Sequence, residues 1–207
     1  ENYYYRAKLA KSGESIMMNF NQYYEGYTQY IQMIDENLNI IGDDQGMEVD
    51  ESGYDQPYSA VCEVNGEFYI AYTNLVYGYG INLQKYNDNG DELWNSPINI
   101  VEADFGDNLV RAIIPSNSGV VVIYETSSFL GTTLNSIFVS DNGSILSQNS
   151  WCNDCSNPQY ESYANGDNEF IVTFKNSSSA LGAGVFAQIF SYTGEMLGDD
   201  DGLSISD

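Results

Sequence analysis

Residues 68–72, Phe-Tyr-Ile-Ala-Tyr, read as a buried β-strand, and three related stretches recur along the chain. They are residues 16–20 (Ile-Met-Met-Asn-Phe), 120–124 (Val-Val-Val-Ile-Tyr) and 170–174 (Phe-Ile-Val-Thr-Phe). The four stretches end on an aromatic residue at positions 20, 72, 124 and 174, so the steps between them are 52, 52 and 50 residues. A fixed period of this size is typical of repeat architectures such as solenoids and propellers.

The second repeat indicates what each unit contains. Asn65-Gly66 is the strongest short hairpin signal, because both central residues of that turn need positive φ. Asp88-Asn89-Gly90 marks a second tight turn. Four strands are expected around these turns, at residues 57–64, 67–73, 81–86 and, for the fourth, 93–94 together with 98–101.

The other repeats follow the same order of strands and turns. Tight turns are expected at Ser12-Gly13, Glu36-Asn37, Ser118-Gly119, Asn142-Gly143, Asn165-Gly166 and Thr193-Gly194. Longer loops between the second and third strands are expected at residues 22–28, 73–80, 125–132 and 175–182. No segment has a convincing helical period with caps.

Four antiparallel strands in each of four repeats predict an all-β fold, a β-propeller with four four-stranded blades. We expect a single domain over residues 1–207, with blades at approximately 1–54, 55–106, 107–157 and 158–207. The four blades could close a small ring or form an arc of a larger one, and the sequence leaves both open.

Charge restricts the partners of this chain. The 207 residues include 30 Asp and Glu against 6 Lys and Arg, a formal net charge of −24. Such a chain repels phosphate backbones and anionic lipid surfaces, so we expect no nucleic-acid partner. No run of 18 apolar residues occurs, so we expect no membrane span.

Two stretches resemble a known repeat. Residues 83–94 (Leu-Gln-Lys-Tyr-Asn-Asp-Asn-Gly-Asp-Glu-Leu-Trp) and 184–206 are similar to the blade repeat of large secreted surface proteins from Bacteroidetes-type bacteria. The resemblance extends over all four repeats but is strong only in these two. It implies a propeller exported by a type IX route and displayed outside the cell, and it says almost nothing about activity.

Two other propeller signatures are incomplete. Gly90 to Trp94 has the spacing of the tryptophan-docking motif of quinoprotein-like blades, but that Trp does not recur in the other repeats. The sialidase aspartate box needs an aromatic residue where Leu93 stands, and Arg6 and Arg111 are too few for an arginine triad. We therefore expect neither quinone binding nor sialidase activity.

The chain contains no histidine, which removes Ser-His-Asp and Cys-His catalysis and imidazole metal sites. Glycoside hydrolysis by two carboxylates stays chemically open. With 30 acidic residues, however, spacing alone cannot nominate a pair.

Aromatic residues in the longer loops are the candidates for ligand binding. Function tends to lie on loops held by a rigid frame, and exposed Tyr clusters suit contact with a sugar or a protein. An alternative of equal weight is that these rings pack between blades. The candidates are Tyr23, Tyr24, Tyr27, Tyr77, Tyr79 and Phe129.

We expect no cofactor, with calcium as the one alternative, because the links between repeats carry carboxylates and Ca²⁺ takes six to eight oxygen ligands. Asp50 and Glu102 lie one period apart, as do Asp55 and Asp107. A contiguous calcium-loop motif is lacking, and a solvated acidic surface explains most of these residues equally well.

Cys152 and Cys155 are expected to form a small disulfide between the third and fourth repeats. No helix follows them to lower a thiol pKa, so a redox motif is disfavoured. The disulfide would indicate an oxidising compartment. Cys62 lies in an alternating strand and is expected to be a buried free thiol.

Our main functional hypothesis is a non-catalytic extracellular or cell-surface module that binds a glycan or a protein through its loop-rich face. The first alternative is a carboxylate-dependent glycoside hydrolase or lyase with its site at the propeller mouth. The second is a purely structural assembly subunit.

Overall fold

The computed structural model describes residues 3–23, 27–53, 58–74, 79–103, 106–129, 131–153, 161–165, 169–176, 184–193, 195–198 and 202–206. Regular structure in these residues is entirely β. Among them there is no helix of the length and hydropathy that a membrane crossing requires.

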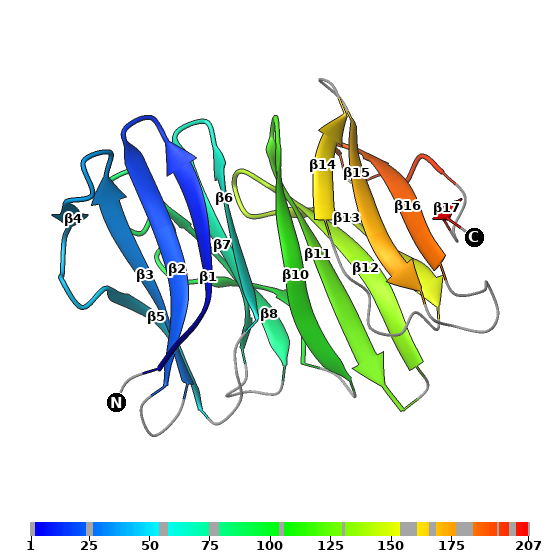
Figure 1. Cartoon of the computed structure of the whole chain (residues 1–207), viewed down its shortest axis with the longest axis horizontal. Helices are drawn as coiled ribbons and strands as arrows, with labels where there is room; N and C mark the ends of the chain where they lie inside the picture. The colour runs from blue at the N-terminus through cyan, green and yellow to red at the C-terminus, as the bar shows by residue number, and fades with distance from the viewer. Residues whose placement is uncertain are drawn as a thin grey trace. The chain divides into compact units, whose positions relative to one another are not determined.

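The strands form four antiparallel sheets, each built from consecutive strands (Figure 1). The first sheet contains β1 (Tyr3–Ser12), β2 (Ser15–Tyr23), β3 (Tyr27–Asp35), β4 (Ile40–Ile41) and β5 (Met47–Gly53). The second contains β6 (Ser59–Val64), β7 (Glu67–Asn74), β8 (Gly80–Tyr86) and β9 (Ile98–Val101). The third contains β10 (Asp107–Ser116), β11 (Gly119–Ser128), β12 (Gly131–Ser140) and β13 (Ile145–Asn153). The fourth contains β14 (Glu161–Asn165), β15 (Glu169–Asn176), β16 (Gly184–Ser191) and β17 (Leu203–Ser206).

The turn at Asn65-Gly66 adopts the backbone conformation that its residues predict. Asn65 and Gly66 have φ of 53° and 89°, as the hairpin turn between β6 and β7 requires. Gly119 begins β11 with φ of 151°, and an added Cβ there would lie 2.1 Å from the carbonyl oxygen of Val139. Glycine is therefore needed at this turn for both conformation and space.

The chain divides into two compact units, Glu1–Asp104 and Phe105–Asp207, each with its own core. In the first unit one face of the first sheet packs on the second sheet through Met17, Ile31, Met33, Phe68, Ile70, Tyr72 and Tyr86. In the second unit the third and fourth sheets pack through Ile114, Val121, Ile123, Leu134, Phe138, Trp151, Phe170, Val172, Phe174, Phe186 and Phe190. The rings of Phe174 and Phe190 each lie 5.3 Å from the ring of Trp151 in edge contacts. Along each strand the contacting residues lie two or four apart, so each core uses one face of each of its two sheets.

Gln32, Gln84 and Gln188 lie 52 and 104 residues apart in the third strands of their sheets. Two of them bond the segment that follows the third strand. Gln84 Nε2 donates to the carbonyl oxygen of Trp94 at 3.2 Å, and Gln32 Nε2 donates to the carbonyl oxygens of Met33 at 3.1 Å and Ile41 at 3.5 Å. Gln188 lies against Gly198, at the matching place in the fourth sheet. The recurrence of Gln in the sequence therefore has a structural cause.

The loops between second and third strands are shorter than the sequence predicted. β2 continues to Tyr23 and β3 begins at Tyr27, while β11 continues to Ser128 and β12 begins at Gly131. Most of residues 125–132 is thus paired strand, because Glu125, Thr126 and Ser127 face Leu134, Thr133 and Thr132 across the ladder. The prediction of a long loop there is wrong, and the correction moves Glu125 into a rigid element.

Candidate active site on the third sheet

Strand register brings two carboxylates to one face of the third sheet. Asp107 lies opposite Ser127, and Leu109 lies opposite Glu125, in the antiparallel pair of β10 and β11. Directly opposed residues share a face, and so do residues two apart along a strand. Asp107 and Glu125 are therefore diagonal neighbours, a relation that places their Cα atoms about 7–8 Å apart.

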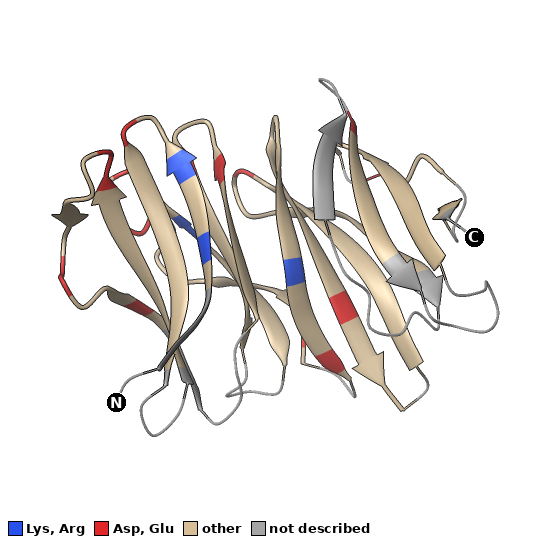
Figure 2. Cartoon of the chain, viewed as in Figure 1, with Lys and Arg blue, Asp and Glu red and all other residues tan. Residues whose placement is uncertain are grey.

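A β-bulge in β10 places the Arg111 guanidinium beside the Glu125 carboxylate. The register shifts between Val110 and Ala112, so Arg111 is the extra residue of the bulge. Its Nε and Nη2 atoms donate to Oε2 of Glu125 at 3.1 Å and 2.8 Å. Bulges often re-aim a side chain beside a functional site. Figure 2 shows the charged bands on the neighbouring strands β10 and β11.

The ion pair lies at the border between core and solvent. The Glu125 side chain is only 8% exposed and that of Arg111 is 23% exposed. Glu125 pairs across the ladder with the fully buried Leu134, next to the apolar cluster around Trp151. A carboxylate in such surroundings requires a charged partner, which Arg111 provides. Asp107, by contrast, is exposed.

A chain of hydrogen bonds fixes the opposite face of the same sheet. Thr126 Oγ1 donates to Asn108 Oδ1 at 2.7 Å, and Asn135 Nδ2 donates to Thr126 Oγ1 at 3.0 Å. Ser150 Oγ then donates to Asn135 Oδ1 at 2.7 Å. One side chain from each of β10, β11, β12 and β13 takes part, so all four strands are locked where Asp107 and Glu125 project.

Tyr124 extends this rigid face. Its hydroxyl accepts a hydrogen bond from Gln148 Nε2 at 2.7 Å. Burial raises the pKa of Tyr124 above its ordinary value, while the bond from Gln148 lowers it by less. The phenol therefore stays neutral at physiological pH and does not serve as a base.

The aromatic ligand site that the sequence predicted is not tested by the described residues. Tyr24 and Tyr77 lie outside the described residues, and Tyr23 and Tyr27 are paired with each other across β2 and β3 without a described side chain. Tyr79 lies just before β8 with φ of 57°. Phe129, at the end of the β11–β12 hairpin, is 89% exposed. A sugar or protein contact by these rings stays a prediction.

The predicted calcium ligands are not brought together among the described residues. Asp55 lies outside them, Asp50 lies in β5 with no described side chain, and Glu102 is exposed after β9. No group of three or more His, Cys, Asp or Glu able to hold a metal occurs within the described ranges. Of this set, Asp107 is the residue that enters the candidate site.

The cysteine predictions have different outcomes. Cys62 is a buried free thiol as expected, and burial raises its pKa above the ordinary value. Cys155 lies outside the described residues, and the side chain of Cys152 at the end of β13 is not described. The disulfide stays a prediction.

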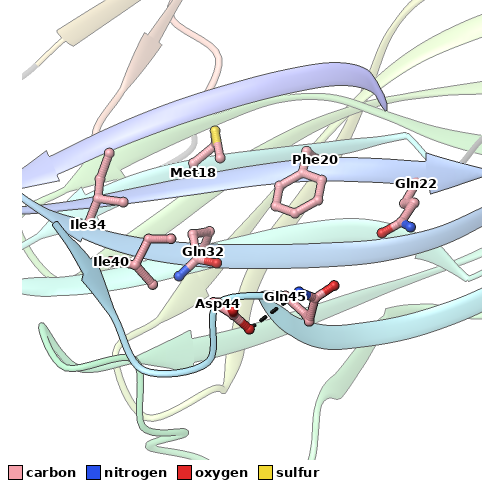
Figure 3. A pocket seen from close by; sticks show the side chains of 8 residues that line it. All are labelled: Met18, Phe20, Gln22, Gln32, Ile34, Ile40, Asp44 and Gln45. Atoms are coloured by element: carbon pink, nitrogen blue, oxygen red, sulfur yellow. Dashed lines mark hydrogen bonds between the residues drawn. The ribbon is translucent and has the colours of Figure 1, made fainter. Parts of the chain in front are cut away.

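A hollow of about 290 Å³ lies on the first sheet (Figure 3). It is lined by Met18, Phe20, Gln22, Gln32, Ile34, Ile40, Asp44 and Gln45. Asp44 is its single carboxylate and accepts a hydrogen bond from Gln45 Nε2 at 3.3 Å. A hollow with one exposed carboxylate lacks the pair of acidic groups that sugar hydrolysis uses.

Comparison with known proteins gives no family model that matches and no matching curated protein. Solved structures do match. The subtype N10 neuraminidase-like protein of A/little yellow-shouldered bat/Guatemala/060/2010 aligns at a TM-score of 0.60 and 11% identity, over 94% of this chain and 58% of its own. β-1,2-Mannobiose phosphorylase from Listeria innocua aligns at 0.57 and 8% identity, over 97% and 75%. The catalytic domain of the Coprinopsis cinerea GH62 α-L-arabinofuranosidase aligns at 0.53 and 10% identity, over 96% and 69%.

This chain has the β-propeller fold. At 8–11% identity the likeness shows the fold alone, and the chain spans a little over half, 58%, of the neuraminidase-like protein. The prediction of four-stranded antiparallel propeller blades is confirmed. The likeness to type IX secretion cargo stays a prediction, as does an extracellular location.

The same comparison corrects the main functional hypothesis. We expected a non-catalytic binding or adhesion module, yet the similar solved propellers include a phosphorylase and an arabinofuranosidase catalytic domain. That hypothesis is contradicted, and the findings favour the catalytic alternative. The sequence missed Glu125 because the residue was assigned to a loop, although the alternation of Val121 and Ile123 continues into it.

Proposed function

We propose that this chain is a catalytic propeller that acts on a glycan by carboxylate chemistry, as a glycoside hydrolase or lyase. The observation that carries the proposal is the position of Asp107 and Glu125 on one face of β10 and β11, with Arg111 bonded to Glu125. The enzymatic character of the similar solved propellers supports it. The glycan and an extracellular site of action are part of the proposal.

Hydrolysis needs two carboxyl groups with separate tasks. One donates a proton to the glycosidic oxygen as the bond to the anomeric carbon breaks, and the other accepts a proton from the water that attacks this carbon. Inverting enzymes hold the two groups about 6.5–9.5 Å apart to leave room for the water. The Cα atoms of diagonal neighbours lie about 7–8 Å apart, and on this ground we expect the carboxyl groups of Asp107 and Glu125 to have the separation of an inverting enzyme.

The first experiment is turnover on a panel of neutral and uronic acid polysaccharides. Asp107→Asn and Glu125→Gln should each lower the rate about 10²- to 10⁴-fold, which is the usual contribution of general acid or base catalysis. Glu195→Gln is the matched control, because Glu195 is an exposed turn residue of the same unit. Wild-type rates for both site variants would overturn the proposal.

A second substrate separates the two roles. An aryl glycoside with a good leaving group needs little protonation, so the variant that lacks the general acid recovers most of its rate on it. The variant that lacks the base stays slow on both substrates. Ultraviolet absorbance of an unsaturated product distinguishes a lyase from a hydrolase.

A further inference from the structure

A group of buried polar side chains lies in the first unit, between the first and second sheets. Asn19, Asn21 and Gln29 are each 0% exposed. Asn21 lies directly opposite Gln29, and Asn19 lies opposite Ile31, so all three share the face that carries Met17 and Ile31. That face packs on the second sheet in the core of this unit. The amides are therefore enclosed by the two sheets.

Ser59 is a further polar residue, on the face of the second sheet that is turned toward the first. It pairs with Tyr72, whose ring is part of the core between the two sheets, so Ser59 faces the first sheet. Strand β6, which carries Ser59, contacts β1 and β2. We name the group of these four side chains, Asn19, Asn21, Gln29 and Ser59, the amide crevice.

Several polar atoms of the amide crevice have no hydrogen-bond partner among the described residues. These atoms are Nδ2 and Oδ1 of Asn19, Oε1 of Gln29 and Oγ of Ser59. The remaining amide group of Gln29 donates to the carbonyl oxygens of Phe20 at 3.2 Å and Tyr30 at 3.4 Å. An unsatisfied buried polar group destabilises the folded protein, so these atoms point to a bound guest.

The repeat shows that the fold does not require an amide at position 19. One and two periods of 52 residues later the corresponding positions hold Ala71 and Ile123, both 0% exposed. An apolar side chain thus serves the same position in two other sheets. An apolar residue at position 19 would need no hydrogen-bond partner, whereas Asn19 does.

The chemistry of the unpartnered atoms selects the guest. Nδ2 of Asn19 needs an acceptor, whereas Oδ1 of Asn19 and Oε1 of Gln29 need donors. A metal cation would satisfy only the oxygens, and an anion would satisfy only the nitrogen. A hydroxyl group both donates and accepts. Because both amide atoms of Asn19 lack a partner among the described residues, a hydroxyl group suits either orientation of the amide.

We propose that the amide crevice is a binding site for hydroxylic guests, filled by ordered water or by a sugar hydroxyl group. Buried waters make about three hydrogen bonds to otherwise unsatisfied groups, which matches the atoms that this crevice offers. The guest bridges the first and second sheets and is independent of the carboxylate pair on the third.

The test is a high-resolution crystal structure of the protein, with and without a neutral oligosaccharide. An oxygen within about 2.7–3.2 Å of Asn19 Nδ2 or Oδ1 in the sugar-free crystal supports the water source. An oxygen that is present only with the oligosaccharide supports the sugar source. A dry crevice in both crystals, or amides bonded to protein groups instead, overturns the proposal.

Stability provides a second measurement. Asn19→Leu removes the hydrogen bonds to the guest while roughly keeping the side-chain volume, so its urea midpoint should fall below that of the wild type. Met17→Leu, on the same strand and face, controls for packing changes and should shift the midpoint less. A raised midpoint for Asn19→Leu would mean that the amide is an unsatisfied group with no guest, which contradicts the proposal.

Discussion

At the residue scale, the bond between Arg111 and Glu125 determines whether a carboxylate can lie beside the core of the second unit. Arg111→Met leaves this carboxylate without its cation and should lower the free energy of unfolding by about 3 kcal/mol. The estimate is at the low end for buried pairs, because the Arg111 side chain is still 23% exposed. Urea unfolding measures the change.

The double variant Arg111→Met with Glu125→Leu is the control for that prediction. Removing both charges also removes the buried uncompensated group, so most of the lost stability should return. If the single and double variants are equally unstable, the loss comes from packing and the ion-pair explanation fails.

Tyr86 gives the fold a dependence on alkaline pH. Burial, then the charge of Glu92 and the neighbouring Tyr72, raise the pKa of Tyr86 above its ordinary value. An unfolded tyrosine titrates near pH 10, so above that pH the unfolded chain loses a proton that folded Tyr86 keeps. Stability is therefore unaffected below about pH 10 and falls above it.

Urea midpoints measured from neutral to alkaline pH test this dependence. Tyr86→Phe should be compared with the wild type at each pH, and its decline above about pH 10 should be shallower. Identical slopes for both proteins would show that Tyr86 does not control the alkaline transition.

At the element scale, the turn before β11 requires glycine because its φ is positive and because no space is left for a Cβ atom. Gly119→Ala places a Cβ 2.1 Å from a backbone oxygen at φ of 151°, and should destabilise the protein by about 2 kcal/mol or more. Gly198→Ala is the matched control, because its Cβ would meet the side chain of Gln188 at an ordinary 3.4 Å. Thermal unfolding of both variants measures the difference. An equal loss of stability in Gly119→Ala and Gly198→Ala would contradict this distinction.

The elements also show what the sequence could predict. Turns such as Asn65-Gly66 were predictable because their conformation depends on the turn residues themselves. The length of β11 was not, since Glu125 and Thr126 are strand only through pairing with β12, a long-range property. The bulge at Arg111 has no local signature either. The carboxylate pair depends on this register, and for that reason the sequence nominated Asp107 only as a calcium ligand and passed over Glu125.

At the scale of the whole molecule, the net charge of −24 acts against compactness. Added NaCl screens the repulsion between exposed carboxylates, so the urea midpoint should rise between about 0.01 M and 0.15 M salt, as the screening length shortens from about 30 Å to about 8 Å. A midpoint that falls with salt would indicate that favourable surface ion pairs outweigh repulsion.

The proposed catalytic activity of the whole molecule requires that Asp107 and Glu125 act as a pair across β10 and β11. The most direct measurement is the anomeric configuration of the first product, followed by proton NMR on a glycan that the protein cleaves. Their diagonal spacing predicts inversion of configuration, and Glu125→Gln should form the product about 10²- to 10⁴-fold more slowly. Retention of configuration, or undiminished cleavage by Glu125→Gln, would contradict the account.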